Sequence, residues 1–155
     1  IAKRQGPSAI AANELVAASY SSDAGQTITD NSSTIIDFED SDYDTHSSVT
    51  TGGSWKFTAP VSGIYNVNSI ATFSFSASDT TRMRLDLHKN GTLFRTGAWV
   101  DITIAINTAG PSFAGDIKLS KGDYIDIRVV HATGSDKSLQ SLSERNWITI
   151  SRKGF

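Results

Sequence analysis

The sequence predicts an all-β protein, folded as an antiparallel β-sandwich of about ten strands. Apolar and polar residues alternate in several segments, as they do in strands that bury one face. Turn residues separate these segments, and none of the segments shows the period of an amphipathic helix. Only 19% of the 155 residues are charged, whereas Ser, Thr, Asn and Gly are plentiful. This composition is typical of a β domain with many turns.

The longest alternating segment, residues 64–76, is expected to bury one face. Its apolar side is formed by Tyr65, Val67, Ala71, Phe73 and Phe75. The full set of expected strands is 15–20, 33–39, 54–58, 64–76, 81–89, 92–100, 101–107, 113–119, 124–131 and 147–151. Between them lie polar loops, of which the longest are 21–31, 40–53, 76–81 and 133–146.

The segment 81–89 divides its side chains between two faces, because successive residues of a strand point to opposite sides. The inward side has Met83, Leu85 and Leu87. The outward side has Arg82, Arg84, Asp86 and His88. We therefore expect one apolar, inward face and one charged, outward face.

Two turns have a clear physical basis. Pro60 lacks the N–H that a strand ladder requires, and Gly63 relaxes the backbone three residues later, so a corner between two strands is expected there. Asn90 and Gly91 both tolerate the positive φ of a type I′ turn, which predicts a two-residue hairpin.

Composition and charge exclude several classes of protein. The net charge of −2 and the pI near 5.9 offer no basic surface for nucleic acid. No apolar run approaches the roughly 18 residues of a membrane span, so no membrane insertion is expected. The sequence contains no cysteine, which favours a cytosolic, bacterial or viral origin over a small secreted domain with disulfides.

The chain is expected to contain one domain. Residues 1–13 carry Lys3, Gly6 and Pro7 among small residues, which predicts an extended arm or linker. Residues 14–155 are enough for a single domain with its own core. Because the sequence begins at Ile1 without a signal-peptide pattern, we expect it to be a piece of a longer chain.

Several short motifs resemble the C1q and tumour-necrosis-factor (TNF) superfamily over roughly residues 38–150. The matching residues are Tyr43-Asp44, Phe57-Thr58, Pro60, Gly63, Tyr65, Asn90-Gly91, Gly115, Leu119 and Lys121-Gly122-Asp123. The resemblance implies a jelly-roll β-sandwich of about ten strands that forms a homotrimer for display and binding. The sequence departs from the family at its closing strand, which reads Asn146-Trp-Ile-Thr-Ile150, and it has no collagen-like repeat.

Within this superfamily, the sequence motifs look most similar to those of C1q-like domains of bacteriophage virion proteins. Trp55-Lys-Phe-Thr-Ala-Pro60, Ile35-Ile-Asp-Phe-Glu-Asp40 and Tyr43-Asp-Thr-His46 carry this similarity. It implies a non-enzymatic, trimeric structural or host-attachment domain on the virion surface, in a tail fibre, a receptor-binding knob, or a capsid fibre or decoration. Residues 1–13 would then join other virion proteins, and the loops would contact a host-cell glycan or protein. The alternative is a secreted, extracellular C1q/TNF-like ligand or carbohydrate-binding module.

The acidic residues Asp40, Asp42 and Asp44 are the candidate metal ligands, with calcium as the cation. Their spacing resembles the start of an EF-hand loop, but Thr45 and Thr51 replace its required glycine and glutamate. The competing interpretation is a solvated strand edge whose charges discourage pairing with other chains. No other cofactor is expected.

The sequence gives no sign of catalysis. His46, His88 and His131 are isolated and lack the spacing of a metal site, which disfavours a metal-dependent jelly-roll enzyme. The sequence has neither a Gly-x-Ser-x-Gly motif nor a cysteine nucleophile.

Aromatic residues are expected in two settings. Trp55 and Trp147, together with Tyr65, Val67, Phe73 and Phe75, are assigned to the core or the trimer interface, because aromatic side chains bury large areas. The candidate binding residues in loops are Trp99, Lys137 and Arg145.

Overall fold

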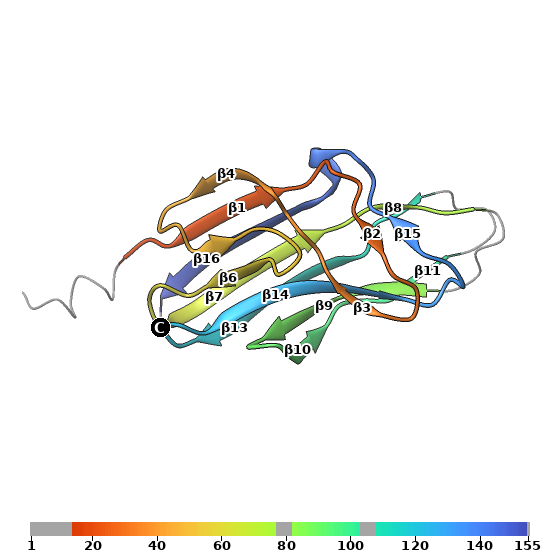
Figure 1. Ribbon diagram of the computed structural model, residues 1–155. Coiled ribbons are helices and arrows are strands. Elements are labelled where there is room, and N and C mark those ends of the chain that lie inside the picture. The colour runs from red at the N-terminus through yellow and green to blue at the C-terminus, as the bar shows by residue number, and fades with distance from the viewer. Residues whose placement is uncertain (1–13, 77–81, 103–107, 155) are drawn as a thin grey trace, which may run out of the picture.

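The computed structural model describes residues 14–76, 82–102 and 108–154, and it confirms the all-β prediction (Figure 1). The only helical element of these residues is the short 3₁₀-helix η1 (Ser143–Arg145). Within the same residues, no helix has the length and apolar character needed to cross a membrane. The expected arm, residues 1–13, and the expected loop at 77–81 lie outside the described residues.

Two antiparallel sheets form the sandwich (Figure 1). The first has five strands in the order β13 (Ser112–Leu119), β7 (Gly63–Ile70), β16 (Trp147–Gly154), β1 (Ala17–Ser21) and β4 (Asp40–Asp44). The second has seven strands, with β10 (Thr92–Thr96), β9 (Arg82–Lys89), β14 (Tyr124–His131), β6 (Lys56–Thr58) and β5 (Val49–Thr50) in order, β11 (Val100–Asp101) on β9, and β3 (Ser33–Ile35) on β14. Two small ladders join β12 (Thr108–Ala109) to β8 (Phe73–Ser74), and β15 (Lys137–Ser138) to β2 (Thr27–Ile28).

Apolar side chains from both sheets meet between the layers. The largest fully buried ones are Trp55, Tyr65, Phe38, Phe57, Phe73, Ile28, Ile36, Met83, Leu85, Leu87, Ile117 and Leu119. The Trp55 ring packs edge-on against Phe38, with 5.4 Å between ring centroids, and its indole N–H donates to the Phe38 carbonyl at 3.0 Å. The buried polar end of this tryptophan is therefore satisfied, as a buried indole requires.

Both predicted turns are present. Asn90 and Gly91 have φ values of 50° and 78°, as the hairpin between β9 and β10 demands. At the corner before β7, a Cβ on Gly63 would lie 2.5 Å from Arg152 Nε and 2.9 Å from the Gly154 carbonyl oxygen. The glycine thus allows the buried arginine to reach the corner, where Arg152 Nε donates to the Ser62 carbonyl at 3.1 Å.

The expected strand 92–100 is wrong in its extent, because β10 ends at Thr96 and β11 begins at Val100. Gly97 between them donates its N–H to the Leu85 carbonyl at 2.7 Å. A Cβ at this position would lie 2.6 Å from that oxygen and 2.8 Å from the Ser112 carbonyl oxygen. The chain is therefore pressed between strands of both sheets here. Most of the next expected strand, 101–107, lies outside the described residues.

Three of the expected polar loops also contain strands. Segment 21–31 contributes β2 and segment 133–146 contributes β15, which pair with each other, while segment 40–53 contributes β4 and β5. The long expected strand 64–76 is divided into β7 and β8. These short strands pair with segments far away in the sequence, so local alternation carries no signal for them.

Candidate functional site

The outer face of the five-stranded sheet, which we call the small-residue face, carries a row of short, uncharged side chains between its two ends. Ser19, Thr149, Asn68 and Ala114 lie in one row across β1, β16, β7 and β13. The residues on the opposite side of the same strands enter the core, including Tyr65, Val67, Ile148 and Ile150. Strand alternation therefore separates an apolar inner face from an outer face that carries this row.

The two ends of the small-residue face differ in polarity. At one end, Trp147 lies opposite Ile70 in the pairing of β16 with β7, and both are half-buried. At the other end, Asp116 pairs with Lys153 at 2.9 Å and accepts a hydrogen bond from Asn66 at 2.8 Å. The hydrogen bonds from Asn66 and Lys153 lower the pKa of the Asp116 carboxyl. One end is thus apolar and the other is charged.

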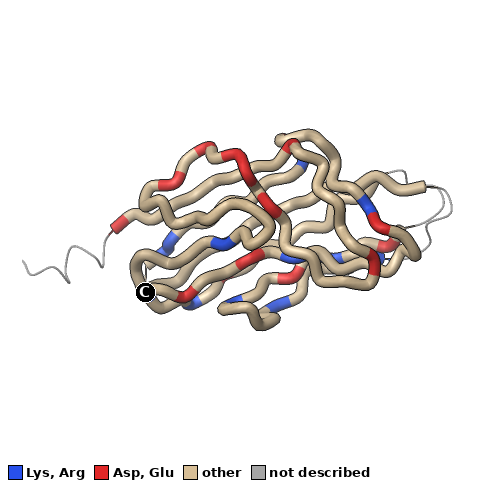
Figure 2. The backbone as a smooth tube through the Cα atoms, in the orientation of Figure 1, with Lys and Arg blue, Asp and Glu red and all other residues tan. Residues whose placement is uncertain are grey.

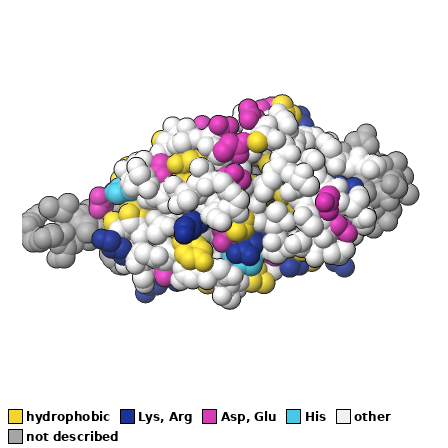
Figure 3. All heavy atoms as spheres, viewed as in Figure 1, with side chains coloured by type: hydrophobic (Ala, Val, Ile, Leu, Met, Phe, Trp, Pro, Cys, Tyr) yellow, Lys and Arg dark blue, Asp and Glu magenta, His cyan; other side chains and the backbone are white. Residues whose placement is uncertain are grey.

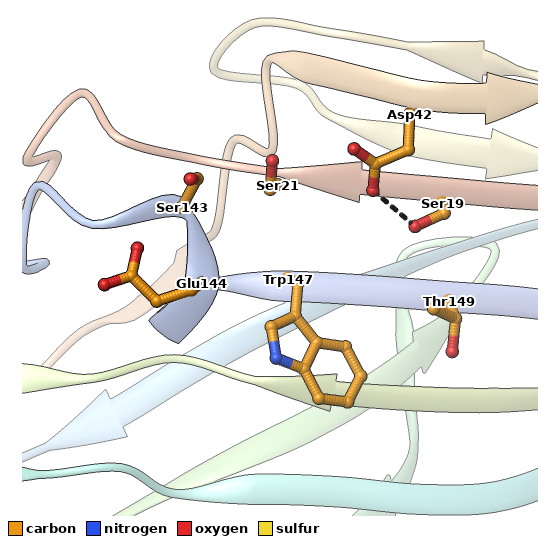
Figure 4. A pocket seen from close by; sticks show the side chains of 7 residues that line it. All are labelled: Ser19, Ser21, Asp42, Ser143, Glu144, Trp147 and Thr149. Carbon is orange, nitrogen blue, oxygen red and sulfur yellow. Dashed lines mark hydrogen bonds between the residues drawn. The ribbon is translucent and has the colours of Figure 1, made fainter.

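A depression of about 270 Å³ lies where β1, β4 and β16 meet η1 (Figure 4). Its lining consists of Ser19, Ser21, Asp42, Ser143, Glu144, Trp147 and Thr149. Ser19 Oγ donates to Asp42 Oδ2 at 2.7 Å, which fixes the carboxylate of the edge strand against the face. The depression therefore combines two carboxylates, several hydroxyls and one indole.

The outer face of the seven-stranded sheet, which we call the ion-pair face, has a different chemistry. Asp86 and Asp126 are each only 2% exposed, and each pairs with an arginine two residues away on its own strand. Asp86 Oδ1 lies 2.7 Å from Arg84 Nε, and Asp126 Oδ1 lies 2.6 Å from Arg128 Nε. The hydrogen bond with Asp126 raises the pKa of Arg128.

Strand pairing places the two ion pairs next to each other. Arg128 lies opposite Asp86, and His88 lies opposite Asp126, in the register of β9 with β14. His88 Nδ1 is buried and has no hydrogen-bond partner. Figure 3 shows basic, acidic, histidine and hydrophobic side chains next to one another over the region of β14. The prediction that Asp86 and His88 lie on the outward side of β9 is confirmed, but both side chains are buried on that face, at 2% and 8% exposure.

Trp99 projects from the chain between β10 and β11 and is 45% exposed. Two arginines of β9 lie over its ring, Arg84 Cζ at 4.3 Å and Arg82 Cζ at 5.0 Å from the centroid. Beside them is a depression of about 250 Å³ lined by Asn31, Arg82, Trp99, Val130, His131 and Ala132. The exposed indole and its arginines therefore form one wall of a cavity.

The residues of the expected metal site lie along one edge strand. Asp40, Asp42 and Asp44 belong to strand β4, and Figure 2 shows acidic positions along the backbone in this part of the molecule. Asp42 accepts from Ser19, whereas Asp44 Oδ2 accepts from the Tyr20 hydroxyl at 3.2 Å and the Val49 N–H at 3.0 Å. A β-bulge between β1 and β4 separates these directions.

Another group of carboxylates comes together at the same edge. Carboxylate oxygen atoms of Asp23, Glu39 and Asp40 lie within 4.8 Å of one another. Among the described residues, this group could hold a cation. Partial desolvation raises the pKa of the Asp40 carboxyl, and the charges of Asp23 and Glu39 raise it further. Of the three expected ligands, only Asp40 belongs to this group.

Comparison with known proteins supports the fold but not a family. No protein-family model matches the sequence, and no curated protein matches it. The structure is similar to murine APRIL at pH 5.0, with a TM-score of 0.65, 13% identity, and coverage of 90% of this chain and 99% of that one.

Two further structures share this fold. Eiger TNF from S. frugiperda has a TM-score of 0.64 and 14% identity, covering 89% of this chain and 92% of that one. The globular domain of zebrafish complement 1qA has a TM-score of 0.57 and 16% identity, covering 88% and 94%. The protein has a C1q/TNF-like jelly-roll fold.

The jelly roll places the expected aromatic residues in two positions. Trp55, Tyr65, Val67 and Phe73 are fully buried between the sheets, and Phe75 is 9% exposed. The Tyr65 hydroxyl donates to the Val61 carbonyl at 2.5 Å, and burial raises its pKa. Trp147 instead lies on the small-residue face, half-buried beside the depression.

The expected binding residues of the loops are not brought together. Trp99 is exposed, but Lys137 belongs to β15, is only 7% exposed and donates to Ser135 Oγ at 3.0 Å. Its assignment to an exposed loop is therefore wrong. Arg145 lies on η1, where its Nη1 donates to Gln140 Oε1 at 3.0 Å.

The histidines are dispersed around the jelly roll. His46 Nε2 lies 2.7 Å from Glu14 Oε1 at the start of the described chain. His131 is buried, with Nδ1 at 3.4 Å from Asp30 Oδ1 and Nε2 at 3.3 Å from the Ile28 carbonyl oxygen. His131 therefore contacts the segment that contains Ile28 and Asp30. His88 belongs to the ion-pair face.

The ion-pair face is the feature that sequence reasoning missed. The sequence does carry a signal, because Arg84-Leu-Asp86 and Asp126-Ile-Arg128 place opposite charges two residues apart on the same side of a strand. Asn146 was also missed. Its side chain is fully buried, and it accepts from the Thr72 N–H at 2.8 Å while donating to the Leu142 carbonyl at 3.0 Å.

Proposed function

We propose that this jelly roll is a non-enzymatic, homotrimeric display domain that assembles through its small-residue face. The observation that carries the proposal is the row of short side chains of Ser19, Thr149, Asn68 and Ala114 across four strands. Short side chains lose little rotamer freedom when a partner covers them, so burying this row costs little conformational entropy. Closed cyclic symmetry is the usual arrangement for identical subunits, and the superfamily resemblance favours three copies.

The two ends of the small-residue face supply binding energy between copies and fix how one copy is placed against the next. Trp147 and Ile70 offer apolar area at one end, and buried aromatic residues commonly dominate the energy of an interface. Asp42 and Glu144 in the neighbouring depression offer negative charge to a basic side chain of another copy. We expect these groups to position the copies around the three-fold axis.

For the biological setting we propose the surface of a bacteriophage virion. The support is the sequence similarity of residues 35–46 and 55–60 to C1q-like domains of phage virion proteins. In this setting residues 1–13 tether the domain to a tail fibre or capsid protein, and the opposite surfaces of the trimer face the host cell. Three identical binding surfaces on one knob would convert weak contacts into avidity.

A secreted ligand or carbohydrate-binding module of the same fold is the second candidate. The jelly-roll likeness to murine APRIL and to the zebrafish complement 1qA globular domain favours it equally. The two settings differ in partner. A virion protein would bind bacterial cells or virion proteins, whereas a secreted ligand would bind an extracellular protein or glycan of its own organism.

Light scattering of the purified domain tests the assembly. The expected mass is three times that of the 16.6 kDa chain. Asn68→Arg should yield a folded monomer, because it places a charge in the middle of the buried face. The matched control is Ser33→Arg, which adds the same charge to an exposed position of β3 on the other sheet and should leave the trimer intact. A monomeric wild-type protein at micromolar concentration would overturn the proposal.

Binding assays test the setting once the trimer is established. A host-attachment knob should bind susceptible bacteria and compete with virus adsorption. A capsid or tail ornament should bind virion proteins instead, and virions without it should lose stability or assemble poorly. Binding to neither cells nor virion proteins would contradict the virion role and favour the secreted alternative.

A further inference from the structure

The most distinctive unassigned feature is the cavity beside Trp99, on the sheet opposite the small-residue face. Its volume of about 250 Å³ lies just below the roughly 300–1,000 Å³ of typical small-molecule sites, so it admits one ring rather than an extended ligand. One wall is the indole of Trp99, which remains 45% exposed although two arginines lie over it. An exposed aromatic surface of this kind offers a platform for an apolar ring face.

The position of the indole is constrained by its surroundings. Gly97, two residues earlier, lies so close to the carbonyl oxygens of Leu85 and Ser112 that no Cβ would fit. The backbone that leads to Trp99 is therefore closely confined. Arg84 is held by its ion pair with Asp86 at 2.7 Å, and its guanidinium carbon lies 4.3 Å from the ring centroid of Trp99. The platform is therefore anchored to β9 by a buried ion pair.

The opposite wall is also firmly held. Asn31 has a positive φ of 52°, and its N–H donates to the His131 carbonyl at 3.1 Å. Asn31 Nδ2 donates to Asp30 Oδ2 at 2.7 Å, and the other oxygen of Asp30 accepts from the Gly134 N–H at 3.1 Å. Both walls of the cavity are thus fixed before any ligand enters, which lowers the cost of binding.

The charges of the site favour an anion. Arg84 is committed to Asp86, but Arg82 is exposed and makes no ion pair with the other described residues. Asp101 lies opposite Arg82 in the pairing of β11 with β9, yet the two form no ion pair. With respect to the described residues, the guanidinium of Arg82 therefore has N–H donors available, and its planar fork matches a carboxylate.

We propose that this cavity binds an acidic sugar, with the pyranose ring stacked on Trp99 and its carboxylate held by Arg82. The inference deepens the proposed display function and rests on it for its biological meaning, because three such cavities on a trimer would give a weak single site useful avidity. A neutral sugar would leave Arg82 without its ionic partner. Nucleic acid is disfavoured by the net charge of −2.

The test is a titration of the ¹⁵N-labelled protein with methyl β-D-glucuronide, using methyl β-D-glucoside as the matched neutral sugar. The glucuronide should shift the indole N–H signal of Trp99 and bind about tenfold or more tightly than the glucoside, because a charge-assisted bond supports it. Arg82→Gln should reduce glucuronide affinity about tenfold or more and leave glucoside affinity unchanged. Arg82→Lys should restore part of the loss.

Variants of the ring separate stacking from general surface effects. Trp99→Ala should abolish binding of both sugars, and Trp99→Phe, which keeps a ring, should retain part of it. The matched control is Phe94→Ala, which removes another exposed aromatic residue stacked by an arginine, Arg95 at 5.2 Å, and should change nothing. The melting temperature of each variant verifies that it is folded.

Several results would overturn the proposal. These are equal affinity for the two sugars, insensitivity to Arg82→Gln, an equal loss in Phe94→Ala, or no shift of Trp99 with either sugar. Light scattering on the same samples keeps the two proposals separate. A trimer that ignores the glucuronide would refute the sugar site alone, whereas a monomer that binds it would refute the assembly alone.

Discussion

The two sheets of this jelly roll share one core but present opposite outer faces. On the small-residue face, the row from Ser19 to Ala114 consists of short, uncharged side chains. On the ion-pair face, Asp86 and Asp126 are nearly as buried as core residues and are neutralised by neighbouring arginines. A face of short side chains can be covered by another subunit at little entropic cost, whereas a face of desolvated charges is already organised.

The difference explains why we assign assembly to one face and recognition to the other. Buried ion pairs hold side chains in fixed positions. Arg84, held by Asp86, lies over the exposed indole of Trp99 and thereby restricts the position of that ring. The small-residue face instead offers a row of short side chains across four strands, which a protein partner can cover. Four substitutions test this contrast, from the largest expected effect to the smallest.

The shared core sets the scale for both faces. Trp55→Ala should lower the free energy of unfolding by about 3–5 kcal/mol, because it removes a fully buried ring and leaves a cavity. Urea denaturation followed by circular dichroism measures the loss. A change below about 1 kcal/mol would show that the sheets do not depend on this contact.

The ion-pair face should be the more sensitive of the two outer faces. Asp86→Asn should cost about 1.5–3 kcal/mol, because it weakens a charge-assisted bond and leaves Arg84 without its anion. The double variant Arg84→Met/Asp86→Leu should recover much of this stability, since apolar residues often replace a buried pair without loss. If both variants are as stable as wild type by urea denaturation, the ion pairs do not organise this face.

The small-residue face should tolerate substitution better. Ser19→Ala should cost about 0.5–1.5 kcal/mol, because it removes one hydrogen bond to Asp42 in a partly buried position. Measured in the monomeric Asn68→Arg background, the loss reports on the face itself rather than on assembly. A loss equal to that of Asp86→Asn would remove the contrast between the faces.

The turn that connects the two sheets should respond to pH. Hydrogen bonds from Lys89, Asn90 and the Ser120 N–H hold the pKa of Asp123 far below its usual range. A lowered folded-state pKa stabilises the protein above the unfolded-state value of about 3.9, and this contribution is lost as the pH falls through the folded-state value. The ionised carboxylate is thus fully effective at neutral pH.

Asp123→Asn should therefore lower stability slightly at pH 7 and have a diminishing effect below about pH 4. The effect is the smallest of the four because asparagine keeps a hydrogen-bond acceptor and an ion pair near the surface contributes little. Melting temperatures of both proteins between pH 2 and pH 7 measure it. A difference that grows as the pH falls would contradict the assigned role of this carboxylate.

Local sequence was sufficient for features that depend on neighbouring residues. Alternation identified the buried sides of β7 and β9, and Asn90-Gly91 identified the hairpin, since both signals act within a few residues. The apolar and charged sides of β9 were also correctly separated by alternation. What alternation could not supply was the solvent exposure of the charged side, which depends on strands distant in the sequence.

The candidate sites show the same limit. The regular spacing of Asp40, Asp42 and Asp44 predicts a common metal site, whereas in the structure the carboxylates of Asp42 and Asp44 accept from Ser19 and Tyr20 across a bulge between β1 and β4. Trp99 was identified as an exposed aromatic residue, yet its arginine partners come from β9 across a strand pairing. Contacts of this kind depend on register between strands, which no local pattern encodes.

By itself the sequence determined the all-β class, the main strands, the corner at Gly63 and the resemblance to the C1q/TNF superfamily. These features follow from the period of the strand, the conformational freedom of glycine and short motifs, all of which are local. Only the tertiary structure decided that one outer face carries a row of short, uncharged side chains, while the other carries buried ion pairs and a cavity. The reason is physical, because burial and pairing depend on which distant strands meet, and the chain settles that through the packing of both sheets on one core.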